Sequence, residues 1–133
     1  MTPRLDAIGM AVGDMAATLG FYRRLGLEIP EGAETEGHVE ATLPGGQRLM
    51  WDSLDVIESF DPDWEQPAGR GRIALAFLCD SPEEVDATYA DLVEAGHRGH
   101  KEPWDAFWGQ RYAEVLDPDG NTVDVFAPLA GTP

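Results

Sequence analysis

An internal repeat constrains the fold of this chain more than any other feature of its sequence. Each half contains a strand-like segment, an amphipathic helix that ends at a glycine, and three short extended segments. The two helices end at Gly26 and Gly96, 70 residues apart. The expected strands are residues 4–12, 27–33, 38–43 and 47–52 in the first half, and 72–79, 97–101, 110–116 and 122–126 in the second. The repeat therefore predicts an α+β fold made of two tandem βαβββ modules.

Both expected helices begin at a residue suited to capping. Asp14 precedes the first helix, where its carboxylate can accept from a free first-turn N–H group. Ser81, Pro82 and Glu84 form a capping sequence at the start of the second. We expect one domain over residues 1–133, because the chain is of ordinary single-domain size. Its expected parts are module one at about 4–52, an acidic and irregular connection at 53–70, and module two at about 71–128.

The charge of the chain excludes some classes of partner. Nine basic and 25 acidic residues give a formal net charge of −16. A surface this negative repels nucleic-acid phosphates and anionic lipids, and it attracts cationic small molecules. The single cysteine, Cys79, excludes an internal disulfide, and no long apolar segment resembles a membrane span or a secretion signal. We expect a cytoplasmic protein with neither nucleic acid nor membrane as a partner.

Three segments together resemble one protein superfamily. They are residues 5–14 (LDAIGMAVGD), residues 21–26 (FYRRLG), and the expected hairpin turn at residues 117–121 (DPDGN). In combination with the two βαβββ modules, they are similar to the vicinal oxygen chelate superfamily of glyoxalases, bleomycin-resistance proteins and extradiol dioxygenases. This resemblance covers residues 4–128. It implies curled mixed sheets that enclose a cleft, and a homodimer, but it leaves the chemistry open.

The metal ligands that the resemblance implies are mostly missing from this chain. Metal-dependent members use histidine and glutamate on the first and last strands of each module. The two histidine positions hold Ala7 and Arg72, neither of which can donate a lone pair to a metal. The carboxylate positions hold Trp51 or Asp52 in module one and Asp124 in module two. Two carboxylates without imidazole make a weak transition-metal site, so we expect no metal and no cofactor. Three histidines are expected to be surface or packing residues: His38, His97 and His100.

The four tryptophans indicate what a metal-free cleft would do. Tryptophan stacks on flat ligands and attracts cations through its ring. The most suggestive stretch is residues 104–112, an expected loop with two tryptophans and a phenylalanine, although these rings can equally seal the core or a dimer interface. Arg72 and Asp124 can pair with each other or bind a ligand, and Tyr112 is favoured over Arg111 to face inward. The candidate ligand-binding residues are Trp51, Trp64, Arg72, Trp104, Phe107, Trp108, Tyr112 and Asp124.

Three function classes follow from these observations. The favoured one resembles the metal-free, antibiotic-binding branch of the superfamily: sequestration of an aromatic antibiotic or natural product, with a cationic one favoured by the acidic surface. The alternative is a glyoxalase-like lyase or isomerase, or a dioxygenase, either with metal ligands at other positions or without metal and using Arg72, Asp124 or Tyr112. A small interaction or regulatory domain is the third.

Overall fold

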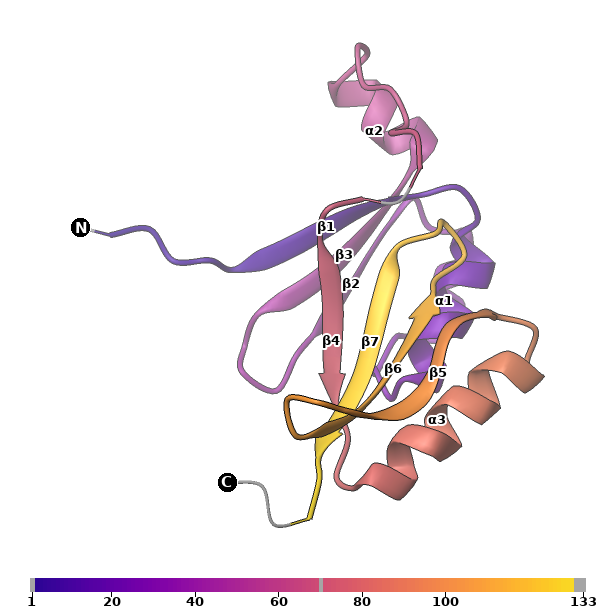
Figure 1. The fold of residues 1–133 in the computed structure, drawn as a ribbon. Coiled ribbons are helices and arrows are strands. Elements are labelled where there is room, and N and C mark those ends of the chain that lie inside the picture. The colour runs from indigo at the N-terminus through magenta and orange to yellow at the C-terminus, as the bar shows by residue number, and fades with distance from the viewer. Residues whose placement is uncertain (1, 70, 131–133) are drawn as a thin grey trace. The chain divides into compact units, whose positions relative to one another are not determined.

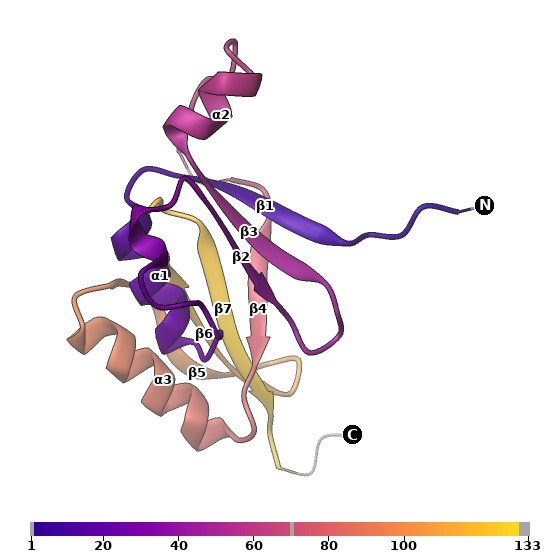
Figure 2. The same cartoon turned by 180° about the vertical axis from the view of Figure 1, so that it is seen from behind.

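The computed structural model describes residues 2–69 and 71–130. Contacts within the chain group it into two compact units, Met1–Gln66 and Pro67–Pro133. The first unit holds a three-stranded sheet with helices α1 and α2, and the second a four-stranded sheet with helix α3 (Figures 1 and 2). The predicted α+β fold class is confirmed. None of the helices in the described ranges is long and apolar enough to cross a membrane.

The first unit contains a mixed sheet in the order β1-β3-β2. Strand β1 pairs in parallel with β3, and β2 pairs antiparallel with β3. Asp14 caps helix α1 as predicted, since its carboxylate accepts a hydrogen bond of 3.1 Å from the N–H of Ala17. The elements of this sheet and its first helix are β1 Ala7–Val12, α1 Met15–Arg24, β2 His38–Thr42 and β3 Arg48–Ser53.

The strand predicted at residues 27–33 is wrong. This segment is a loop that leads into a 3₁₀ helix, η1 Ala33–Thr35, and it runs beside α1 (Figure 2). Pro30 has no N–H for a sheet, and Gly32 has a φ of +81°, which extended strands do not adopt. Arg23 of α1 fixes the loop instead, because it donates to the Pro30 carbonyl at 2.6 Å and pairs with Glu34. Module one is therefore βαββ in its described residues.

The predicted connection at residues 53–70 is not wholly irregular. It begins with a short helix, α2 Leu54–Phe60, whose first turn is capped by Ser53: the Ser53 hydroxyl accepts from the N–H of Val56 at 3.3 Å. Along the chain, the boundary between the two units falls between Gln66 and Pro67, inside the predicted connection.

The second unit contains a mixed sheet in the order β4-β7-β6-β5. Strands β4 and β7 are parallel, and β6 pairs antiparallel with both β7 and β5. Ser81 caps α3 as predicted by accepting from the N–H of Glu84 at 3.2 Å. The elements are β4 Ala74–Leu78, α3 Pro82–Glu94, β5 Arg98–Ala106, β6 Gln110–Leu116 and β7 Thr122–Pro128.

Two connections in the second unit position the residues discussed below. Strand β5 continues to Ala106, so Trp104 lies on a strand and the predicted loop shrinks to a turn at residues 107–109, closed by Gly109 at a φ of +92°. The predicted hairpin turn at residues 117–121 is confirmed. There the buried Asp117 carboxylate accepts from the N–H groups of Asp119 and Asn121 at 3.0 and 2.8 Å.

Helix α3 packs against one face of the four-stranded sheet (Figure 1). Its Val85 and Leu92 side chains are fully buried, as are Val115, Val123 and Val125 of the sheet. These residues form the core of the unit and leave the opposite face of the sheet for other uses.

Candidate functional site

The face of the second sheet opposite α3 carries most of the predicted ligand-binding residues. Arg111 marks the α3 side, because its guanidinium donates to Asp86 on that helix at 2.9 Å. Adjacent strand residues point to opposite faces, so Tyr112 lies on the other side. Tyr112 pairs across the sheet with Trp104 on β5 and with Phe126 on β7, and cross-strand partners share a face. Tyr112 and Arg111 therefore lie on opposite faces of this sheet, with Tyr112 on the face away from α3.

Five rings on this face and in the turn beside it form what we call the aromatic cluster: Trp104, Phe107, Trp108, Tyr112 and Phe126. Trp108 is central, with ring centroids 5.6 Å from Trp104, 4.9 Å from Phe107 and 5.3 Å from Tyr112, all close to edge-to-face. Tyr112 stacks on Phe126 at 5.9 Å. Phe107 and Trp108 remain 89% and 46% exposed. The cluster is thus a preassembled apolar surface with two of its rings open to solvent.

A buried carboxylate lies on the same face as the cluster. Asp124 is only 7% exposed, and the Tyr112 hydroxyl donates to its Oδ2 atom at 2.6 Å. Its Oδ1 atom is buried and has no hydrogen-bond partner among the described residues. Burial first, and then the hydrogen bond and charge of Asp124, raise the pKa of Tyr112 above its ordinary value of 10. Tyr112 therefore keeps its proton and remains a donor at neutral pH.

The first unit has a second group of polar residues on the sheet face opposite α1. Trp51 marks the α1 side, since its ring contacts Tyr22 of that helix at 5.3 Å. The next residue, Asp52, lies on the other face and pairs with Nδ1 of His38, whose Nε2 pairs with Glu40 at 2.7 Å. Hydrogen bonds to Glu40 and then to Asp52 raise the pKa of His38 above 6.5. His38 is thus an exposed strand residue that is held between two carboxylates.

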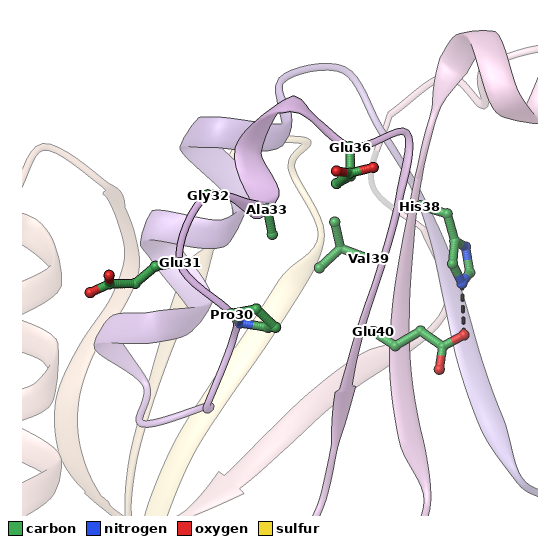
Figure 3. A pocket seen from close by; sticks show the side chains of 8 residues that line it. All are labelled: Pro30, Glu31, Gly32, Ala33, Glu36, His38, Val39 and Glu40. Carbon is green, nitrogen blue, oxygen red and sulfur yellow. Dashed lines mark hydrogen bonds and ion pairs between the residues drawn. The ribbon is translucent and has the colours of Figure 1, made fainter.

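A small pocket of about 260 Å³ lies beside β2 in the first unit (Figure 3). Pro30, Ala33 and Val39 line it with apolar groups, while the hydrogen-bonded pair of His38 and Glu40 lies on the other side of the strand from Val39 (Figure 3). Its volume is slightly below the roughly 300 Å³ at which pockets for drug-sized ligands begin. We assign no ligand to this pocket.

The residues at the family's metal positions do not fit a metal centre. Ala7 offers no donor atom, and the exposed guanidinium of Arg72 has no lone pair. One oxygen of Asp124 accepts a hydrogen bond from Tyr112, and Asp52 is paired with His38. Within residues 2–69 and 71–130, no group of three or more histidine, cysteine, aspartate or glutamate side chains is arranged to hold a metal ion.

The structure brings five of the eight predicted residues onto one face of the second unit, or into the turn beside it: Trp104, Phe107, Trp108, Tyr112 and Asp124. Trp51 lies in the core of the first unit, fully buried, and Trp64 lies half-buried after α2. Arg72 is exposed just before β4, and its proposed partner Asp124 bonds to Tyr112 instead. Sequence reasoning missed Phe126, which strand alternation could have found two residues after Asp124.

Comparisons with known proteins agree with this fold. The profile of the Glyoxalase/Bleomycin resistance protein/Dioxygenase superfamily matches residues 4–125. The uncharacterized protein YraH of Bacillus subtilis (strain 168) is 29% identical over 131 residues, which cover 95% of this chain and 99% of YraH.

Solved structures share this fold. A glyoxalase/bleomycin resistance protein/dioxygenase family enzyme from Burkholderia phytofirmans PsJN superposes with a TM-score of 0.82 at 20% identity, over 96% of this chain and 100% of the other. A glyoxalase/bleomycin resistance protein/dioxygenase from Nocardioides superposes with a TM-score of 0.75 at 25% identity, over 100% of this chain and 89% of the other.

Proposed function

This chain belongs to the glyoxalase/bleomycin resistance protein/dioxygenase superfamily, and we propose that it uses the fold as a metal-free binding protein that sequesters a flat aromatic small molecule, an antibiotic or natural product. In this proposal, resistance arises because binding lowers the free concentration of the compound, and no bond of the ligand is made or broken. The proposal concerns the aromatic cluster and Asp124 beside it.

The observation that carries the proposal is the exposure of Phe107 and Trp108 within a preassembled cluster. Burying such rings stabilises a protein in water. One side of the Trp108 ring is already covered by Trp104 and Tyr112, and the rest of the ring stays exposed. Edge-to-face contacts hold the Trp108 ring in place, and the hydrogen bond of 2.8 Å from its Nε1 to Gln110 orients it further. A rigid aromatic surface loses little conformational entropy when a flat ligand stacks on it.

Charge supports a preference for cationic aromatic ligands. The net charge of −16 raises the local concentration of cations around the protein. Beside the cluster, the ammonium group of Lys101 lies 4.8 Å from the centre of the Trp104 ring, so one of these rings already accepts a cation on its face.

A thermal-shift panel of flat aromatic compounds tests the proposal. A ligand that binds only the folded state stabilises it in proportion to the logarithm of its concentration over Kd, so binders raise Tm. We expect a Phe107→Ala variant to lose much of the shift. Phe60→Ala is the matched control, because Phe60 is also an exposed phenylalanine (67%) but lies on α2, outside the cluster. Absence of any shift across the panel, or equal loss in both variants, would contradict sequestration at the cluster.

An enzyme is the second candidate, and one observation favours it. The His38–Asp52 pair on the face opposite α1 is an imidazole oriented by a carboxylate, which is a common general-base arrangement. A glyoxalase-like lyase or isomerase, or a dioxygenase, would then act on a small substrate. Elemental analysis of protein purified without chelator separates the two candidates: a stoichiometric bound metal would favour the enzyme and oppose metal-free sequestration.

We also propose that the chain is a cytoplasmic homodimer, as the superfamily resemblance implies. Sedimentation velocity at micromolar concentration tests the assembly: a dimer is expected, and a monomer at every concentration would contradict it.

A further inference from the structure

We propose that Asp124 selects the ligand: its Oδ1 atom accepts a hydrogen bond from a cationic N–H group on the aromatic molecule held by the cluster. The inference rests on the proposed function and deepens it by naming a ligand class. That class is planar aromatic cations that carry N–H donors, such as amidinium groups.

The unpartnered oxygen of Asp124 is the first support. A carboxylate removed from water loses hydration that only hydrogen-bond donors or a cation can replace. Asp124 is 93% buried, and Tyr112 satisfies Oδ2 alone. The remaining Oδ1 atom is a buried acceptor for which the described residues supply no donor. This atom is closed to solvent, so a ligand donor reaches it only when a neighbouring side chain moves aside; the ligand then gains a charge-assisted hydrogen bond without displacing a protein donor.

The surroundings of Asp124 favour a cation over a neutral donor. Glu114 lies directly across from Asp124 on the neighbouring strand, and both carboxylates raise the pKa of Tyr112. Among the described residues, Asp124 is hydrogen-bonded to Tyr112 and not to the exposed Arg72, which the sequence suggested as a partner. A positive group near these two carboxylates is therefore attracted by both.

The geometry of the face supplies the aromatic part of the ligand class. Asp124 and Phe126 are two residues apart on β7 and so share a face, and Phe126 stacks on Tyr112 of the aromatic cluster. The Tyr112 hydroxyl also fixes the orientation of the carboxylate by holding its Oδ2 atom. One rigid face thus joins a stacking surface to an oriented acceptor.

Three probes of similar shape separate the contributions to binding. 2-Naphthamidinium carries a charge and N–H donors, 2-naphthamide carries donors without charge, and N-methylquinolinium carries a charge without donors. Titration calorimetry at physiological salt measures each Kd for the wild type, for Asp124→Asn and for Glu94→Gln. Glu94→Gln is the matched control, because Glu94 is an exposed residue at the end of α3 and the substitution removes the same unit of charge.

We expect 2-naphthamidinium to bind the wild type about 10- to 100-fold more tightly than either other probe, the range for a charge-assisted hydrogen bond. Asp124→Asn is expected to abolish this preference and Glu94→Gln to keep it.

Equal affinities of naphthamidinium and N-methylquinolinium would overturn the inference, since charge alone would then suffice. Equal affinities of all three probes would overturn it as well, but would leave aromatic binding intact. Failure of all three to bind would overturn the proposed function together with the inference. The wild-type probe comparison needs no variant, so it holds even if Asp124→Asn folds poorly.

Discussion

Replacing Tyr112 with phenylalanine removes one hydroxyl group and keeps the ring that stacks on Phe126. That hydroxyl is the donor to Asp124, whose other oxygen already lacks a partner, so the variant leaves a buried carboxylate with no donor among the described residues. A hydrogen bond to a charged group contributes about 1.5–3 kcal/mol. We therefore expect Tyr112→Phe to lose about 2 kcal/mol of unfolding free energy at pH 7.

Urea denaturation followed by tryptophan fluorescence measures this loss. With an m-value of about 2 kcal/mol/M, the midpoint is expected to fall by about 1 M. The loss should also depend on pH. Because the pKa of Tyr112 is raised in the folded state, its stabilising contribution is complete below the unfolded value of about 10 and declines as pH rises through the folded value. The difference between wild type and variant should therefore shrink above about pH 10.

Tyr89→Phe is the matched control for this prediction. Tyr89 is a half-buried tyrosine on α3, and its hydroxyl donates no hydrogen bond to any of the described residues. Its change in unfolding free energy at pH 7 should stay within about 0.5 kcal/mol, as for substitutions that remove no specific interaction. If Tyr112→Phe were equally mild, the Tyr112–Asp124 hydrogen bond would not be a stabilising feature of the protein.

Three further predictions concern other parts of the two units. Hydrogen bonds to two carboxylates, that of Glu40 first, raise the pKa of His38, so Glu40→Gln should lower it in an NMR titration; an unchanged pKa would contradict the pairing. The stability that protonated His38 gains from these two carboxylates is present below pH 6.5 and is lost as pH rises through the raised pKa. It is at most about 1 kcal/mol for such an exposed group. Gly99→Ala should cost about 1–3 kcal/mol by overpacking, because its Cβ would lie 2.1 Å from the Tyr89 hydroxyl, and the cost measured in urea should be smaller in a Tyr89→Phe background. Asp117→Ala should cost about 2–3 kcal/mol, since two turn N–H groups lose their buried acceptor; a melting temperature equal to that of the wild type would refute this role.

Local signals made the helices and most strands predictable. Asp14 and Ser81 cap helices where the sequence placed them, and the turn at residues 117–121 forms between the last two strands. These features depend on neighbours within about four residues, which the sequence displays directly. The helix α2 was missed although Ser53 offered the same kind of capping signal, because the acidic composition of the segment suggested a loop.

Features that depend on distant contacts were harder to predict. The loop at residues 27–33 has strand-like residues, but Arg23 binds it to α1. The predicted end of β5 was too early because register shifts between Gly99 and Trp104 break the alternation that strand prediction relies on.

In the candidate site too, features set by neighbouring residues were predictable and features set by distant contacts were not. Alternation along β6 put Tyr112 on the opposite face from Arg111, and the tryptophan content drew attention to Trp104 and Trp108. The sequence did not reveal the Tyr112–Asp124 hydrogen bond, because it joins two residues that are 12 positions apart on adjacent strands. It also gave no reason to separate Trp51, which packs into the core of the first unit, from the exposed rings.

Tryptophan fluorescence titration with flat aromatic compounds tests the central claim most directly, because Trp104 and Trp108 belong to the proposed binding surface. Sequestration predicts saturable quenching by aromatic cations in the wild type, with weaker binding in Trp108→Ala and unchanged binding in Phe60→Ala, whose substitution lies outside the cluster. Quenching that is absent for every compound, or that is the same in Trp108→Ala as in the wild type, would contradict the account.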